Sequence, residues 1–281
     1  SKVMVYIAAE FKEVELGASA SSVLDISKAS YDNVSFSVAS EETSPRNLAF
    51  NADGTKMYVI GIGTDSALQY SLSTGFDLST ASYDSVSFSV ASQDTGPSGL
   101  TFNTDGTKMY IVGFLTDTVY QYSLSTGFDL STASYGNVSF SVASQDGAPL
   151  SLTFNADGTK MYMVGNLNDS VYQYSLSTGF NLSTASYDSV SFSVASQDTT
   201  PSSIAFNADG TKMYVAGAAG SVLQYSLSTA YDISTASYDS VSFSVSSQDT
   251  APPGLAFSND FTKMYIVGYI NDSVFQYSTG L

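Results

Sequence analysis

Few side chains in this sequence could do chemistry, and they are regularly spaced. The chain has no histidine and no cysteine, which removes most nucleophile–base pairs and most transition-metal sites. It has one arginine, Arg46, followed by Asn47. Carboxylates recur at nearly constant intervals in two series. The first is Glu42, Asp94, Asp146, Asp198 and Asp249, and the second is Asp65, Asp117, Asp169 and Asp272.

These acids suggest two roles. Carboxylates that converge on one point bind Ca²⁺, which takes six to eight oxygen ligands. A loop aspartate more often accepts hydrogen bonds from its own turn, and no segment has the spacing of a known calcium loop. We therefore expect no cofactor, with Ca²⁺ as the alternative. Glycosidases place carboxylates on inner strands, but the segments expected there, such as Gly99–Phe102, carry none. We predict that the chain is not an enzyme.

The acids belong to a repeat that fills most of the chain. Lys-Met-Tyr occurs five times, and its methionines are 52, 52, 52 and 51 residues apart. A fixed period of about 50 residues indicates a series of similar supersecondary units. The five methionines are Met57, Met109, Met161, Met213 and Met264.

Each repeat is predicted to form four strands. In the second copy, Ser98–Phe102 and Lys108–Gly113 flank an Asp-Gly turn, which favours a tight hairpin. Asp117–Ser125 follows a loop, and Val138–Ser144 alternates apolar residues with serine, as a half-exposed strand does. Four antiparallel strands at this period are typical of a propeller blade. The sequence therefore predicts an all-β protein, a five-bladed β-propeller with four-stranded antiparallel blades.

The two ends of the chain predict how the ring closes. Residues 22–40 match the tail of a repeat, and the last copy lacks that tail. We expect an N-terminal outer strand, Val34–Ser40, to complete the blade that Leu255–Tyr277 begins, which removes exposed edges. Residues 22–281 are then the propeller. Residues 1–21 are expected to form a β extension that packs on the side of the propeller or, as we favour, docks onto another virion or surface protein.

The repeat resembles the blade of the YVTN/lactonase-like β-propeller superfamily. The resemblance rests on Pro-x-x-Leu-x-Phe, Asp-Gly-Thr-Lys-Met-Tyr-Val-x-Gly and Asp-Ser-Val-x-Gln-Tyr, and it covers residues 22–281. It implies the fold more than a function, because propellers host many activities. The nearly identical copies, rich in Ser, Thr and Tyr, also resemble repeats of bacteriophage tail and adhesion proteins. That likeness implies a receptor-facing role on a virion.

The five copies differ mainly in two loops. One precedes the first strand of each blade (the D–A loop), and the other joins its second and third strands (the B–C loop). In a propeller both lie on one face, around the channel mouth, and loops on a rigid scaffold commonly bind ligands. Neutral drift among duplicated copies is the alternative. The predicted ligand-binding residues are Arg46, Asn47, Ile62, Ser98, Phe114, Leu150, Asn166, Ser202 and Tyr269.

The opposite loops repeat an aromatic residue, as Phe76, Phe128, Phe180 and Tyr231. These rings either stack on sugars or, as we favour, pack between blades. In the last copy Phe261 replaces the turn glycine. A phenylalanine takes a positive φ only at a cost, so we expect a different turn there.

Composition narrows the class of partner. The net charge of −17 disfavours nucleic acids and anionic membranes. No apolar stretch is long enough to span a bilayer, so no membrane insertion is expected. We expect a non-enzymatic binding module, extracellular or virion-associated, that recognises carbohydrate or a cell-surface receptor on a phage virion or secreted protein. A structural or assembly propeller is the alternative.

Overall fold

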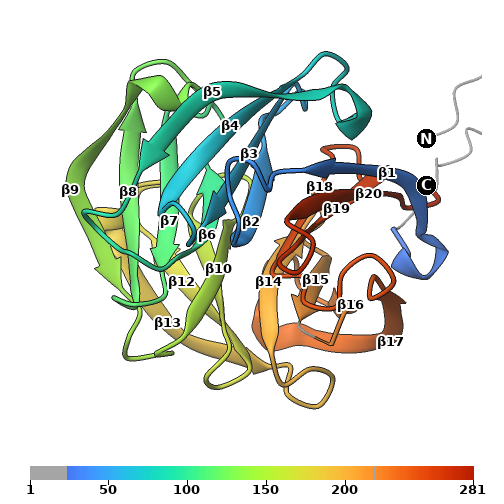
Figure 1. Cartoon of the computed structure of the whole chain (residues 1–281). Coiled ribbons are helices and arrows are strands. Elements are labelled where there is room, and N and C mark those ends of the chain that lie inside the picture. Colours follow the sequence, from blue (N-terminus) through green and yellow to red (C-terminus); the bar gives the residue numbers. More distant parts are fainter. Residues whose placement is uncertain (1–23, 218) are drawn as a thin grey trace, which may run out of the picture.

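The computed structural model describes residues 24–217 and 219–281, which form five four-stranded antiparallel sheets around a central axis (Figure 1). The predicted five-bladed β-propeller is confirmed. The prediction for residues 1–21 falls outside the described residues. The first blade consists of β2 (Pro45–Phe50), β3 (Lys56–Gly61), β4 (Ser66–Leu72) and β5 (Ala81–Ser89), from the axis outward.

The next three blades repeat this order. The second blade is β6 (Pro97–Phe102), β7 (Lys108–Gly113), β8 (Thr118–Leu124) and β9 (Ala133–Ser141); the third is β10 (Pro149–Phe154), β11 (Lys160–Gly165), β12 (Ser170–Leu176) and β13 (Ala185–Ser193); the fourth is β14 (Pro201–Phe206), β15 (Lys212–Gly217), β16 (Ser221–Leu227) and β17 (Ala236–Ser244). Within each blade, neighbouring strands in the sequence are neighbours in the sheet.

The fifth blade joins the two ends of the described chain. Its strands are β18 (Gly254–Phe257), β19 (Lys263–Gly268), β20 (Ser273–Ser278) and, on the outside, β1 (Ser30–Ser37). Figure 1 shows β1 alongside β20, so closure by an N-terminal outer strand is confirmed.

The closing strand lies earlier in the sequence than the predicted Val34–Ser40. The pairing of β1 with β20 shifts register between Tyr31 and Val34, and Asn33 takes φ 58° at this bulge. The bulge lets pairing continue back to Ser30, which the alternation of apolar residues alone does not reveal. All four of the other outer strands have a register shift at the equivalent position, which also makes these sheet edges irregular.

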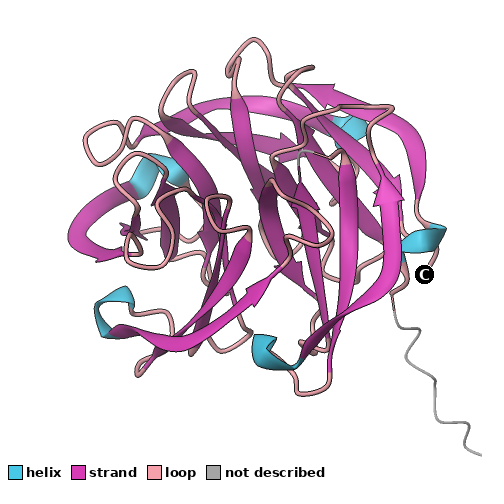
Figure 2. Ribbon diagram, turned by 90° about the horizontal axis from the view of Figure 1, so that it is seen from below, coloured by secondary structure: helices cyan, strands magenta, loops and turns pink. Residues whose placement is uncertain are grey.

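A short 3-10 helix precedes each outer strand where we expected only loop. In the first blade Asp77 caps this helix, because its carboxylate accepts a hydrogen bond from the Ser79 amide. The five helices are η1 (Ile26–Lys28), η2 (Leu78–Thr80), η3 (Leu130–Thr132), η4 (Leu182–Thr184) and η5 (Ile233–Thr235). In Figure 2 they lie at the periphery of the strands. No helix among the described residues is long and apolar enough to cross a membrane.

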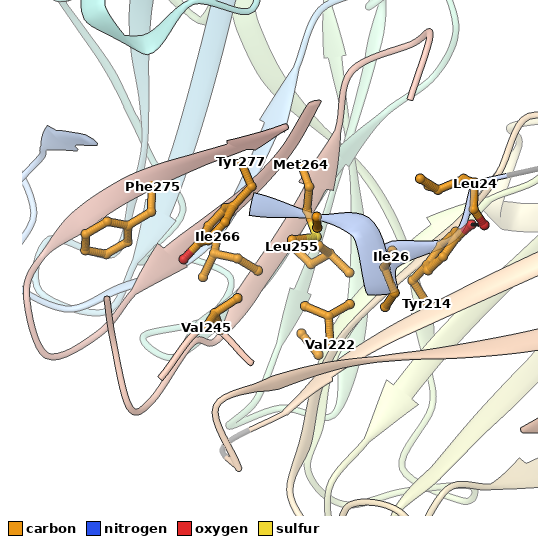
Figure 3. Close-up of a cluster of buried hydrophobic side chains, with 12 residues drawn as sticks. Leu24, Ile26, Tyr214, Val222, Val245, Leu255, Met264, Ile266, Phe275 and Tyr277 are labelled. Atoms are coloured by element: carbon orange, nitrogen blue, oxygen red, sulfur yellow. Dashed lines mark hydrogen bonds between the residues drawn. The ribbon is translucent and has the colours of Figure 1, made fainter. Parts of the chain in front are cut away.

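The hydrophobic core lies between neighbouring blades. Figure 3 shows one such cluster, in which Tyr214 of β15 packs with Leu24, Ile26 and residues of the fifth blade. Second strands such as β19 are buried on both faces. Hydrogen bonds add to this packing: the Tyr58 hydroxyl donates to the Phe128 carbonyl of the next blade at 2.5 Å. The blades are therefore joined by apolar contact and by buried tyrosine hydroxyls.

The repeated aromatic residues of the C–D loops, which join the third and fourth strands, pack within the protein. The Phe76 ring lies 5.5 Å from the Phe50 ring, and a Cβ atom at the turn residue Gly54 would overlap it. The turn therefore needs glycine both for its φ of 72° and for the space above it. The sugar-stacking alternative for these rings is not supported.

The fifth blade corrects our expectation for Phe261, which takes φ 59° in a turn of the same kind. Leu24 stands at the C–D loop position where the first blade has Phe76. The Phe261 ring lies 5.3 Å from Phe257, so it supplies from the turn the aromatic contact that Phe76 supplies from the loop. We infer that this packing offsets the cost of the positive φ.

Candidate binding site at the channel mouth

In four of the five blades, the acid of the first series fastens the two variable loops together. Asp94 accepts the Gly96 amide at 2.5 Å through Oδ1, and the Thr116 amide and hydroxyl at 2.9 and 2.6 Å through Oδ2. Gly96 lies in the D–A loop and Thr116 in the B–C loop. All five acids of this series are at most 5% exposed. Their burial and hydrogen bonds identify them as loop clamps.

The acids do not form a cation site among the described residues, where no group of three or more could hold a metal. Asp65 belongs to the second series and takes φ 49°, while its carbonyl accepts the Val90 amide. Burial, followed by repulsion from Glu42 and Asp94, raises the pKa of Asp65. The structure therefore gives no support to bound Ca²⁺.

The fourth blade departs from the clamp. Its B–C loop is one residue shorter than in the other copies. Asp198 still accepts the Thr200 amide at 2.7 Å through Oδ1. Its Oδ2 is buried and has no hydrogen-bond partner among the described residues. Among the described residues, the clamp in this blade therefore holds only the D–A loop.

The inner strands close the channel between its two mouths. The Asn47 side-chain amide donates to the hydroxyls of Ser151 and Ser203 at 3.3 and 3.4 Å, and all three residues are buried. Gly99 and Gly254 occupy the equivalent positions in the other two blades. A Cβ at Gly99 would lie 2.9 Å from the Leu150 carbonyl oxygen, so the strands approach closely here. This middle layer separates the two mouths.

A pocket of about 140 Å³ lies above that layer, on the face of the variable loops. Its lining includes the residue just before the middle layer in every blade. The full lining is Arg46, Ser98, Leu150, Asn166, Thr200, Ser202, Ala251, Pro252, Pro253 and Tyr269.

The structure brings six of the nine predicted binding residues to this pocket: Arg46, Ser98, Leu150, Asn166, Ser202 and Tyr269. Asn47 lies in the closed layer instead. Ile62 and Phe114 are 36% and 42% exposed and do not line the pocket. Whether any of these residues binds a ligand stays a prediction.

Four lining residues were missed, namely Thr200, Ala251, Pro252 and Pro253. The signal for them was present, because all four lie in the variable D–A segments. The prediction took the first or second residue after the proline in most copies. In the fifth copy two consecutive prolines carry the chain around the mouth, and the segment before them also reaches the pocket.

Arg46 dominates the chemistry of the pocket. Its guanidinium carbon lies 4.6 Å from the centre of the Tyr269 ring, a cation–π contact. The side chain is half-buried, and burial lowers its pKa from the usual value, while Tyr269 and Glu42 oppose that shift. Arginine stays protonated in proteins all the same. In the described part of the chain, no carboxylate lies within 4 Å of this cation.

The other polar groups of the pocket are mostly occupied. The Ser98 hydroxyl donates to the carbonyls of Val112 and Pro149, and the Ser202 hydroxyl makes the equivalent bonds to Ala216 of its own blade and Pro252 of the next. The pocket lining therefore offers Arg46, the Asn166 amide and the Tyr269 hydroxyl as its main donors beside apolar side chains. Among the described residues no acid lines it, so they supply the pocket with no carboxylate base.

No protein-family description matches the chain, and no curated protein matches its sequence. Solved structures do match its fold. A "putative 6-phosphogluconolactonase" from Bacteroides uniformis superposes with a TM-score of 0.52, at 14% identity, over 83% of this chain and 67% of its own. A functionally unknown protein from Desulfotomaculum acetoxidans superposes with a TM-score of 0.53, at 15% identity, over 82% of this chain and 81% of its own. A protein from Lactobacillus plantarum superposes with a TM-score of 0.50, at 14% identity, over 83% of this chain and 67% of its own.

These matches correct the functional expectation. A non-enzymatic module for carbohydrate or a receptor on a phage virion or secreted protein is wrong on this comparison, because a protein with this fold is named as an enzyme. We had argued against an enzyme because the five blades are nearly symmetric. That symmetry belongs to the scaffold, whereas the loops at the channel mouth differ from blade to blade. That the chain itself is not an enzyme stays a prediction, because identities this low show the fold alone. The resemblance to phage repeats receives no support; the chain shares the β-propeller fold with a protein named as a lactonase.

Proposed function

We propose that this chain binds a small molecule bearing a phosphate or carboxylate group in the pocket at the channel mouth, through Arg46. The observation that carries the proposal is the half-buried guanidinium, which lines the pocket and has no carboxylate within 4 Å among the described residues. A guanidinium offers five donors in a planar fork that fits either anion. The acids nearest the mouth are engaged by backbone amides instead.

The size of the pocket limits the ligand. A pocket of about 140 Å³ lies below the usual range for drug-sized ligands, roughly 300–1,000 Å³. One anionic group and a short polar body fit this space. The apolar lining from Leu150 and Pro253 favours a ligand with one uncharged side.

The name of the Bacteroides uniformis protein supplies the first ligand class to test. A phosphorylated sugar acid or its lactone carries both a phosphate and a carboxyl or lactone group. In our proposal the phosphate contacts Arg46 and the Asn166 amide contacts the body of the sugar. Hydrolysis would require a water activated by a group that the pocket lining does not include, so we propose binding and test turnover separately.

Isothermal titration with 6-phosphogluconate tests the proposal, with glucose as the ligand that carries neither a phosphate nor a carboxylate. We expect saturable binding of the phosphorylated acid only. Arg46→Gln should weaken it about 10- to 100-fold, since a hydrogen bond to a charged group contributes about 1.5–3 kcal/mol. Lys28→Gln is the matched control, because it removes a positive charge from the exposed Lys28 of η1, outside the pocket. Equal binding by Arg46→Gln would refute the proposal.

Turnover is measured with 6-phosphogluconolactone, by following proton release. Hydrolysis by the intact chain that Arg46→Gln abolishes would extend the role of the pocket to catalysis. Binding without hydrolysis would restrict it to recognition. Neither result alters the test of Arg46 as the anion-binding residue.

A further inference from the structure

The other mouth of the channel is a second, separate cavity. It measures about 260 Å³ and lies on the face of the A–B turns, which join the first two strands of each blade. Because Asn47, Ser151 and Ser203 close the channel, this cavity does not communicate with the pocket around Arg46. Its walls come from inner strands and turns of the first three blades, with Asn259 from the fifth.

The lining of this cavity combines aromatic rings with polar side chains, among them Asn103, Asn155 and Asn259. Phe50, Phe102 and Phe154 end three adjacent inner strands and line it. Thr101 and Thr153 lie beside them, where the other three blades have alanine. No described residue hydrogen-bonds either threonine hydroxyl. The cavity thus presents phenylalanine rings together with hydroxyl and amide groups.

The phenylalanine rings are fixed in place. The Phe102 ring lies 4.6 Å from Tyr58 and 5.4 Å from Phe128, and Phe154 makes equivalent contacts at 4.6 and 5.4 Å. Rings held on their far sides in this way cannot turn away from the cavity. A fixed aromatic face attracts a cation through its quadrupole.

Exposed aspartates surround this mouth, and Lys108 lies near it, with its ammonium group donating to the carbonyl of Phe180, a residue of the cavity lining. Every A–B turn exposes one aspartate, and four of the five follow directly on a residue that lines the cavity: Asp53, Asp105, Asp157 and Asp260. Asp105 accepts the Thr107 hydroxyl and amide, and these bonds lower its pKa. It is therefore ionised at neutral pH. The acids at the opposite mouth are buried clamps, and Arg46 lines that pocket.

We propose that this second cavity binds a small organic cation, a substituted ammonium ion with an apolar body. The apolar body would contact the phenylalanine rings, the turn aspartates would attract the charge, and the threonine hydroxyls would accept from a polar substituent. A volume of about 260 Å³ suits a compact ammonium compound. The two mouths of this propeller then select ligands of opposite charge.

Choline and 3,3-dimethylbutan-1-ol test the proposal, because they share shape and hydroxyl and differ only in charge. Binding is followed by NMR shift titration of the full chain at low and high salt. We expect choline to bind saturably, the alcohol to bind at least about tenfold more weakly, and salt to weaken choline because it screens exposed charges. Equal binding of both probes, or saturable binding of neither, would overturn the proposal.

Single substitutions test which residues form the choline site. Asp105→Asn should weaken choline about two- to fivefold, the size of one exposed electrostatic contact. Asp209→Asn is the matched control: it changes the same turn position in the fourth blade, whose turn does not line the cavity. Thr101→Ala copies the alanine of the first blade, and should weaken choline without affecting folding. Arg46→Gln should leave choline binding unchanged, which separates this test from that of the anion pocket. Equal effects of Asp105→Asn and Asp209→Asn would contradict the placement.

Discussion

The clamp between the variable loops predicts that the same Asp→Asn substitution costs more stability in the second blade than in the fourth. Asp94→Asn keeps one side-chain oxygen for the Gly96 amide but replaces Oδ2 with an amide donor that faces the Thr116 amide and hydroxyl. Asp198→Asn makes the same chemical change in the fourth blade. There Oδ2 has no partner among the described residues, so no hydrogen bond is lost at that atom.

The magnitudes follow from the bonds lost. Asp94→Asn removes two hydrogen bonds to a buried carboxylate, each contributing about 1.5 kcal/mol or more, so the free energy of unfolding should fall by about 3 kcal/mol. Asp198→Asn should cost less than about 1 kcal/mol, because Oδ1 still accepts the Thr200 amide. The difference of about 2 kcal/mol is the predicted contribution of the link to the B–C loop.

Urea unfolding at pH 7 measures both values. The chain has 20 tyrosines and no tryptophan, so tyrosine fluorescence and circular dichroism follow the transition. Equal costs for the two substitutions would show that the Oδ2 contacts do not hold the B–C loop. A larger cost for Asp198→Asn would reverse the reasoning.

Two further predictions concern single blades. Phe261→Gly should lower the free energy of unfolding by about 1–2 kcal/mol, since lost aromatic burial outweighs relieved backbone strain. Leu24→Phe should destabilise the native chain but restore stability in the Phe261→Gly background. Additive effects of the two substitutions in urea unfolding would contradict this exchange of one aromatic ring for the other. Gly136→Asp should give Lys108, which now donates to the Phe180 carbonyl, the ion pair found in the other four blades. The gain should be about 0.5–1 kcal/mol at pH 7, and unfolding curves that show no gain would refute it.

The pH dependence of that gain follows from Asp84, the equivalent residue in the first blade. Burial opposes its ionisation, but hydrogen bonds from Lys56, Ser71 and Gln69 outweigh burial and hold its pKa below the usual 3.8. A carboxyl group with a lowered folded pKa stabilises the protein above its unfolded pKa, and that contribution disappears as the pH falls through the folded pKa. The advantage of Gly136→Asp should therefore be full at pH 7 and decline in acid below about pH 4.

The sequence predicts the architecture well because the signals are repeated five times. Period, alternation and the Asp-Gly turn fix the blades, and the incomplete last copy fixes the closing strand. The outer-strand boundaries were misplaced because a bulge near Asn33 interrupts the alternation. Phe261 was misjudged because its ring packs on Phe257 where Leu24 replaces the loop phenylalanine, and Leu24 is distant in the sequence and adjacent only in the folded blade.

The candidate site was predicted in part. Variation between copies identified Arg46 and Tyr269, and the structure places them in cation–π contact. Variation between copies did not distinguish residues that line the pocket from exposed residues at its edge. Phe114 was therefore included, although its side chain is exposed outside the pocket. The clamp role of the acids was also hidden, because a loop aspartate in a sequence does not show which amides it accepts. The second cavity depends on Thr101 and Thr153, two small differences in strands that otherwise read as scaffold.

The most direct test of the proposed function is a crystal structure of the chain grown with 6-phosphogluconate. We expect the phosphate to lie within hydrogen-bonding distance of the Arg46 guanidinium, with the ligand body between Asn166 and Pro253. A ligand found elsewhere, or an empty pocket at concentrations that saturate binding in solution, would contradict the assignment of this mouth as the anion site.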